Sequence, residues 1–204
     1  MIQVIKKIFS PTVMQSAMQQ FGEISLQNFL IYTLIGISIL FIIIIICRIY
    51  GKIILISDVL TGVVLSIYGS IIIQLTLMCR ENGSRIGIEL NLFHGLLGAH
   101  NNFHWLMWAY VLLNCLLFVP YGFTISLFSM INDRKPWIQL LSITLLSFIT
   151  SMTIECTQLI LQRGYYEIQD LVVNTLGGIF GWVLFRILFE IVKIVMRRRG
   201  DTEC

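Results

Sequence analysis

The chain carries little charge for its length. Only 12% of its 204 residues are Asp, Glu, Lys or Arg, whereas soluble domains carry about 25%. The formal net charge of +3 is small, and the basic residues sit at the ends of apolar runs, where membrane topology places them. The composition therefore excludes an ordinary soluble domain, and we expect no nucleic-acid partner. No internal repeat or low-complexity linker is present, which favours one domain.

The usual catalytic and cofactor motifs are also missing. G-x-S-x-G, the P-loop and H-E-x-x-H do not occur, so nothing favours serine, nucleotide or zincin chemistry, and no cofactor is expected. The cysteines form no C-x-x-C pair, and several lie inside apolar runs, which is typical of packed thiols. His94, His100 and His104 lack the spacing of zinc ligands, so we expect no metal site and keep zinc as the alternative.

Long apolar runs dominate what is present. Hydrophobic residues make up 57% of the chain, the mean hydropathy is +0.86, and the runs reach about 20 residues, the length that crosses a bilayer. Backbone polar groups in a bilayer need internal partners, so each run must be helical. The sequence predicts an all-α polytopic membrane protein with about five transmembrane helices, at 28–47, 58–79, 104–130, 136–161 and 170–195.

The first 27 residues form a separate N-terminal segment. Apolar residues recur there at near-helical spacing, which predicts one or two short amphipathic helices at the membrane interface. The stretch "IGIELNLFHGLLG", residues 86–98, is apolar for a loop, and we expect it to lie along the interface. Residues 28–200 are expected to form a single transmembrane domain.

The basic residues predict the orientation. With five spans, one set of loops and the C-terminal tail carry Arg48, Lys52, Arg134, Lys135, Lys193, Arg197, Arg198 and Arg199. The other set carries only Arg80, Arg85 and Arg163. This asymmetry places the C-terminus in the cytoplasm, and the N-terminus and the loops 80–103 and 162–169 outside. Lys6 and Lys7 in the N-terminal segment count against this orientation.

The fourth span carries a polar face. Steps of four, four, three and four place five residues on one side of the helix, namely Ser147, Ser151, Glu155, Gln158 and Gln162. An intramembrane carboxylate is rare and usually faces a bundle interior or a wet cavity, so Glu155 must be paired, hydrated or protonated. The alternative is a polar packing seam between helices.

The fifth span begins with polar and small residues on one side. Asp170 suits the start of a helix, either as a cap or as a functional acid. Gly177 and Gly181 form a small-x-x-x-small pattern that allows close packing. The short connection predicts an antiparallel hairpin of spans four and five, which brings Glu155 and Gln158 to the depth of Asn174.

Two further residues extend this group. Arg163 lies close to Glu167 and Asp170 in sequence, so it either forms a salt bridge within the loop or presents its guanidinium to a carboxylate or phosphate. Asn114, in an apolar helix that Pro120 should kink, either holds helices together or forms a hydrogen bond with Glu155 or Asn174.

Four segments resemble motifs of the VanZ-like family, named for a membrane protein associated with teicoplanin resistance in bacteria. They are "ELNLF", "NCLLFVPYGF", "TIECTQLILQ" and "DLVVNTLGG". The last three look like the family's N-x-x-x-F-x-P-x-G, IE-x-x-Q and D-x-x-x-N-x-x-G-G patterns. The resemblance covers about 65–190 and departs at His94, where the family commonly has proline. The family's polar positions fall on Asn91, Asn114, Pro120, Gly122, Glu155, Gln158, Arg163, Asp170, Asn174, Gly177 and Gly178.

The resemblance implies a multi-pass protein of the bacterial cytoplasmic membrane with a role near the cell envelope, and it supplies no activity. Our leading hypothesis is an outward-facing polar cleft that acts on a lipid-linked or cell-wall substrate. If it is catalytic, Glu155 is the general acid or base and Asp170 its companion. Asn114, Gln158, Arg163 and Asn174 would bind the substrate. The alternatives are a non-enzymatic factor that alters the access of a glycopeptide or partner to the membrane surface, and a transporter.

Overall fold

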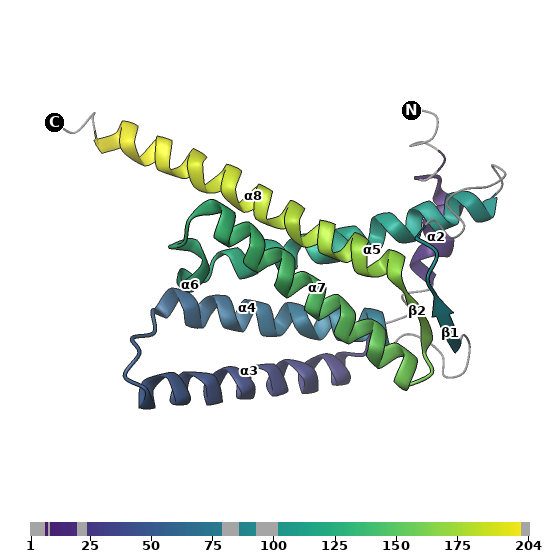
Figure 1. Cartoon of the computed structure of the whole chain (residues 1–204), viewed down its shortest axis with the longest axis horizontal. Coiled ribbons are helices and arrows are strands. Elements are labelled where there is room, and N and C mark those ends of the chain that lie inside the picture. Colours follow the sequence, from purple (N-terminus) through teal and green to yellow (C-terminus); the bar gives the residue numbers. More distant parts are fainter. Residues whose placement is uncertain (1–6, 8, 20–23, 79–85, 93–101, 201–204) are drawn as a thin grey trace.

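The apolar runs form long helices that pass back and forth along one bundle (Figure 1). The computed structural model describes residues 7, 9–19, 24–78, 86–92 and 102–200. Successive long helices run in opposite directions, and the α3–α4 and α7–α8 connections are short. They are α3 (Leu26–Ile49), α4 (Ile56–Ile73), α5 (Asn102–Ser126), α7 (Pro136–Ile160) and α8 (Ile168–Gly200). The all-α fold predicted from the sequence is confirmed.

Within the described residues, four helices are long and apolar enough to cross a membrane. They are Leu26–Ile49, Ile56–Met78, Trp105–Ser126 and Pro136–Ile160. The third ends before the predicted residue 130, because the chain turns at Leu127 into the short α6 (Ser129–Asn132). The fifth predicted span is helical throughout as part of α8, but α8 is not among these four helices. Its sequence is more polar, with Asp170 near its start and Arg186 and Glu190 further along.

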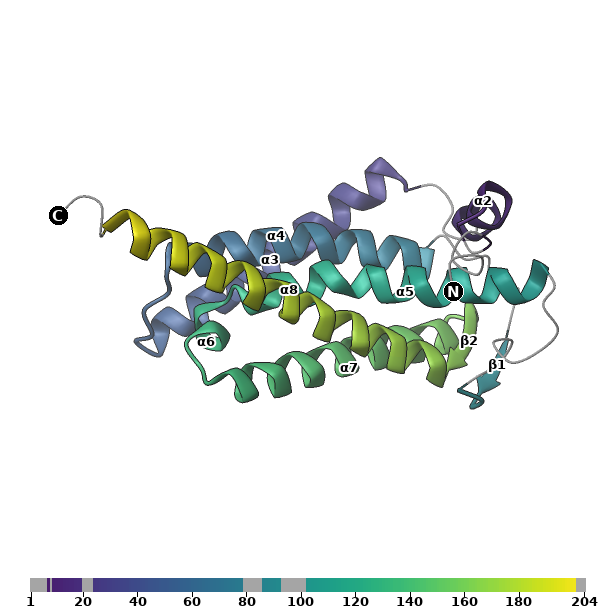
Figure 2. The ribbon, with the colours of Figure 1, turned by 90° about the horizontal axis from the view of Figure 1, so that it is seen from above.

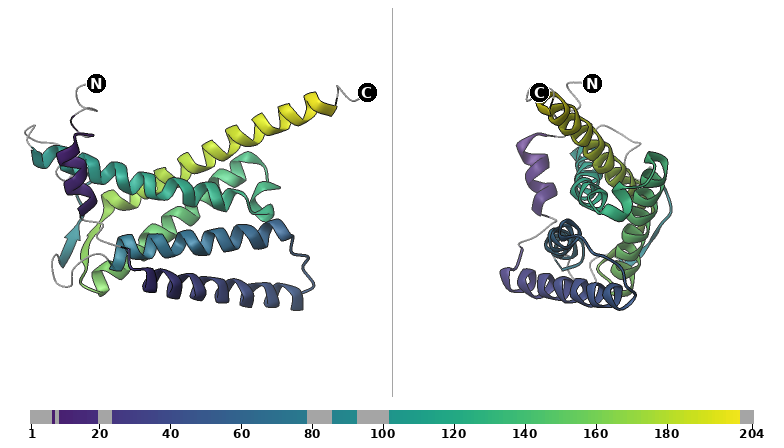
Figure 3. Two further views of the ribbon diagram at one scale, coloured as in Figure 1. Left: turned by 180° about the vertical axis from the view of Figure 1, so that it is seen from behind. Right: turned by 90° about the vertical axis from the view of Figure 1, so that its left-hand side faces the viewer.

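The two ends of the bundle differ in what they hold. The α3–α4 connection, α6 and the C-terminal end of α8 gather at one end (Figures 1 and 2). The helix α2 (Pro11–Gln19), β1 (Ile86–Glu89) and β2 (Gly164–Glu167) lie at the other end, which we call the β-strand end. The view from behind in Figure 3 shows the same division. The loops that the sequence assigns to opposite sides of the membrane therefore lie at opposite ends.

A small parallel sheet joins the two loops of the β-strand end. β1 pairs with β2 in a register that places Gly87 beside Tyr165 and Glu89 beside Glu167. A side chain on Gly87 would overlap the Tyr165 ring, so glycine is needed for this contact. The sequence analysis treated both segments as loops and did not predict this pairing. Residues 93–98 of the predicted interfacial stretch lie outside the described residues.

The N-terminal helix packs on the start of α5. Val13 of α2 is buried against Trp105 and Ala109, and Lys7 Nζ lies 5.4 Å from the centre of the Trp105 ring. Among the described residues of this segment, α2 is one of the one or two short helices that the sequence predicted. Lys7 lies at the β-strand end, away from most of the described basic residues.

Candidate functional site

The polar face of α7 points into the bundle. Ser147, Ser151, Glu155 and Gln158 are each exposed by 1% or less, whereas most neighbouring residues outside this face are exposed or half-buried. The single buried face predicted from the spacing is confirmed for these four residues. Gln162 does not belong to it, because α7 ends at Ile160 and Gln162 is exposed with φ of 55°.

Glu155 ties α7 to the chain that leads into α8. Its Oε2 accepts a hydrogen bond from the backbone N–H of Glu167 at 3.0 Å. The bond crosses the α7–α8 connection, so the carboxylate helps to hold the predicted antiparallel hairpin together. A carboxylate that accepts a backbone N–H gains a charge-assisted bond, which lowers the cost of burying it.

A π-helical turn at the end of α4 supplies acceptors for two of the predicted residues. This turn, η1 (Gln74–Met78), widens the helix, and such turns frequently occur at functional sites. Gln158 Nε2 donates to Thr76 O at 3.0 Å, and Arg163 Nη1 donates to Leu77 O at 2.9 Å. Arg163 also lies 3.4 Å from the Met78 sulfur. Both predicted substrate-binding residues therefore also connect α7 and its following loop to α4.

The first turns of α8 add an acid and an amide. Asp170 is 7% exposed in the first turn, where a carboxylate is favoured by the helix dipole. Asn174, one turn further, donates from Nδ2 to Ser151 Oγ at 2.9 Å. Its Oδ1 is buried and has no hydrogen-bond partner among the described residues.

We call the group of Glu155, Gln158, Arg163, Asp170 and Asn174 the α7–α8 polar cluster. The structure brings all five to the β-strand end, and four of them are at most 7% exposed. Arg163 is half-buried and directly precedes β2. A buried group of this composition can bind a polar ligand, transfer protons, or hold the helices in place.

Asn114 does not join this cluster by a hydrogen bond. It is half-buried on α5, and no bond links it to Glu155 or Asn174 among the described side chains. Of the two alternatives for Asn114, the described side chains therefore do not show the hydrogen bond, and the Asn174 amide donates to Ser151 instead. Two other hydrogen bonds join α5 to its neighbours. The Tyr68 hydroxyl of α4 donates to Leu117 O at 2.7 Å, and the Tyr121 hydroxyl bonds Thr150 of α7.

The glycines let α8 lie directly on its neighbours. A side chain at Gly177 would overlap Cys115 O, and one at Gly181 would overlap Val119 O, both on the α5 backbone. Gly122 of α5 would likewise meet the backbone of Gly178. The packing role predicted for the glycine pattern is confirmed, and the close approach positions Asp170 and Asn174 against α7.

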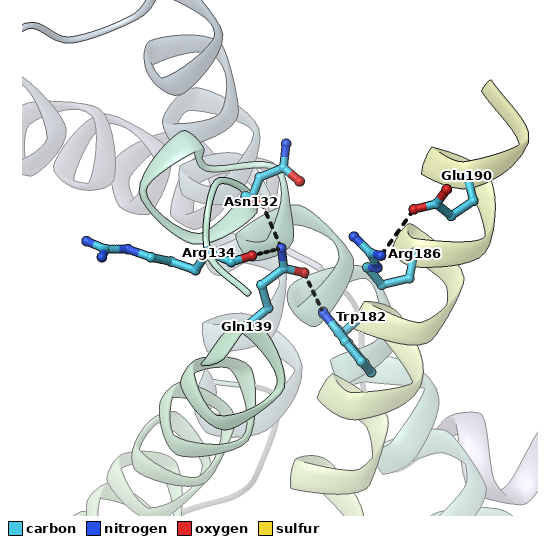
Figure 4. A network of polar contacts seen from close by, with 6 residues as sticks. All are labelled: Asn132, Arg134, Gln139, Trp182, Arg186 and Glu190. Carbon is cyan, nitrogen blue, oxygen red and sulfur yellow. Dashed lines mark hydrogen bonds and ion pairs between the residues drawn. The ribbon is translucent and has the colours of Figure 1, made fainter. Parts of the chain in front are cut away.

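A second polar network lies at the opposite end of the bundle (Figure 4). Gln139, 1% exposed, donates from Nε2 to Asn132 O at 2.7 Å and to Arg134 O at 2.8 Å. Its Oε1 accepts from the Trp182 indole N–H at 3.1 Å. The amide thus fastens the α6–α7 turn to α8, and its partners indicate a structural role.

Sequence reasoning missed the acceptors on η1 and the pairing of β1 with β2. The alternation of Ile86, Ile88 and Leu90 was a signal for a strand, and the neighbouring Tyr165 and Tyr166 also favour one. Nothing comparable marks the π-helical turn. His94 and His100 lie outside the described residues, and only the backbone of His104 is described. No group of three or more His, Cys, Asp or Glu side chains suited to a metal occurs in the described ranges.

The comparisons with known proteins give one match. The profile of the VanZ/LLP1 family matches residues 29–189, most of the chain. The match begins well before residue 65, where the motif resemblance began, and so includes α3. No curated protein and no solved structure matches the chain.

Proposed function

The chain belongs to the VanZ/LLP1 family, and from that premise we propose that it acts at the bacterial cell envelope through the α7–α8 polar cluster. The chain is a membrane protein with several long apolar helices. We infer that the β-strand end faces outward. Lys7 and Arg163 lie at that end, whereas six described basic residues of the connections and tail lie at the opposite end. They are Arg48, Lys52, Arg134, Lys135, Lys193 and Arg197.

The observation that carries the proposal is the meeting of distant segments around Glu155. Its Oε2 accepts a hydrogen bond at 3.0 Å from the N–H of Glu167, the last residue before α8, whose first turn carries Asp170. Buried acids, amides and an arginine beneath the outward face of a membrane protein suit the polar head of a lipid-linked or cell-wall precursor. Ordinary membrane lipids surround the rest of the bundle.

Arg163 is the residue we assign to an anionic group of that substrate. A guanidinium has five N–H donors in a planar fork, and Nη1 of Arg163 donates to Leu77 O. The side chain is half-buried, so it can meet a phosphate or carboxylate that approaches from the β-strand end. Gln158 and Asn174 would bind neutral polar groups deeper in the bundle, with Asn114 beside them on α5.

The catalytic form of the proposal gives Glu155 the role of general acid or base and Asp170 that of its companion. Both side chains are almost fully buried. The substrate would therefore reach them after a movement of β1 and β2, which cover this end. Many enzymes have active sites that open and close by such a loop movement.

We expect Glu155→Gln to abolish the cellular phenotype while membrane levels stay unchanged, because the amide keeps the shape of the acid and loses its charge. The measurement is the susceptibility of a producing strain to a teicoplanin-type glycopeptide, alongside the amount of protein in its membranes. Asp133→Asn, at an exposed acid of the opposite end, is the matched control. A Glu155→Gln strain that behaves like the control would remove the catalytic form.

The alternative is a non-enzymatic factor that alters the access of a glycopeptide or partner to the membrane surface. Tyr165 favours it, because this aromatic ring is 38% exposed at the β-strand end and lies against Gly87. In that case Tyr165→Ala should remove the phenotype and Glu155→Gln should preserve it. The reverse pattern would exclude the alternative.

A further inference from the structure

The C-terminal part of α8 runs past the end of the helix on which it packs. Trp182 bonds Gln139, and Gln139 lies one turn inside α7, which begins at Pro136. Phe185, 4% exposed, is the last buried residue along α8 among the described side chains. Residues 186–200 continue as helix and leave the bundle at an angle (Figures 1 and 3).

This projecting segment is amphipathic. Up to Arg197, its charged residues follow one another at steps of four, three and four, which places them on one narrow face; they are Arg186, Glu190, Lys193 and Arg197. The rest of the described surface is apolar. Most of these apolar side chains are 47–69% exposed, namely Ile187, Leu188, Ile191, Val192, Ile194, Val195 and Met196.

Neither bulk water nor the hydrocarbon core suits such a segment. Water would leave the apolar side chains exposed, and hydrocarbon would surround the Arg186–Glu190 pair, whose side chains are 26% and 48% exposed. The membrane interface suits both faces at once. The preceding residues 168–185 also cover about 27 Å at the helical rise, close to the roughly 30 Å of the hydrocarbon core.

We propose that residues 186–199 form an interfacial anchor that binds anionic phospholipid headgroups on the C-terminal side of the membrane. Glu190 pairs with Arg186 at 3.1 Å, whereas Lys193 and Arg197 form no ion pair with another described residue. These two cations are thus available to headgroups, and the sequence continues with Arg198 and Arg199. The apolar side of the segment lies against the acyl chains.

The first test measures lipid selectivity of the purified full-length chain in nanodiscs with equal amounts of phosphatidylglycerol and phosphatidylcholine. The ratio of the two lipids retained after detergent extraction is expected to favour phosphatidylglycerol. Lys193→Gln with Arg197→Gln should lower this preference by about fivefold for each removed charge. Lys52→Gln with Lys135→Gln removes the same charge from the α3–α4 connection and the start of α7, at the same end, and serves as control. An equal loss in both double variants, or no loss, would overturn the proposal.

The second test measures the depth of the segment with nitroxide labels on a background without native cysteines. A label at Glu190→Cys should be more accessible to a water-soluble relaxation agent. A label at Ile191→Cys should be more accessible to oxygen dissolved in the acyl region. Oxygen contact at both positions would show that the segment crosses the membrane. Spin–spin broadening that disappears on dilution with unlabelled protein would show that a second copy covers it. Either result contradicts the anchor.

Discussion

At the scale of single residues, the bond between Asn174 and Ser151 is the best-defined contact of the polar cluster. Asn174 Nδ2 lies 2.9 Å from Ser151 Oγ, and both side chains are almost fully buried. Loss of this hydrogen bond leaves the buried Asn174 amide N–H without a partner. The resulting loss in free energy of unfolding is larger than the net contribution of the bond.

We therefore predict that Ser151→Ala destabilises the protein by about 1–3 kcal/mol, the cost of leaving a buried polar group without its partner. Ser38→Ala, at an exposed serine of α3 that bonds only its own helix at Leu34 O, should have almost no effect. Unfolding in detergent micelles, followed by tryptophan fluorescence, gives both values. Equal effects would show that the Asn174 bond contributes nothing.

The sequence predicted the polar residues that share one face of a single helix. Ser147, Ser151, Glu155 and Gln158 share a face because the period of a helix puts them there. Their partners were less predictable, since Gln158 and Arg163 bond backbone carbonyls. A carbonyl carries no residue-specific signal, and these two lie in the last turn of the described helix, where carbonyls lack a partner within the helix.

At the scale of elements, the close crossing of α5 and α8 positions the site. The Gly177-x-x-x-Gly181 pattern predicted this crossing, since small residues allow two backbones to approach. The β1–β2 pairing was not predicted because it joins segments far apart in sequence, and strands of four residues give weak periodic signals.

Gly181→Ala should lower stability by about 1–3 kcal/mol through overpacking, since the added methyl group meets the backbone of Val119 and Phe123. Gly69→Ala is the matched control, because nothing lies within 4 Å of its added carbon. Alanine there should be neutral or slightly stabilising. Thermal unfolding of the two variants in the same detergent compares them, and a Gly181→Ala variant as stable as Gly69→Ala would contradict the crossing.

At the scale of the whole molecule, the separation of the two ends predicts the topology. A cysteine introduced by Tyr165→Cys, in a chain without its native cysteines, should react with a membrane-impermeant reagent in intact cells. Lys52→Cys, also at an exposed position, should react only after the cells are opened. The opposite labelling would invert the orientation and place the polar cluster on the cytoplasmic side.

The central claim is that the α7–α8 polar cluster binds the polar head of a lipid-linked cell-wall precursor. The most direct measurement is the binding of a lipid-linked peptidoglycan precursor to the purified chain in nanodiscs, compared between wild type, Glu155→Gln and Asp133→Asn. We predict saturable binding that Glu155→Gln weakens at least tenfold, about 1.4 kcal/mol, and that Asp133→Asn leaves intact. Equal affinity in all three proteins, or no saturable binding, would contradict the claim.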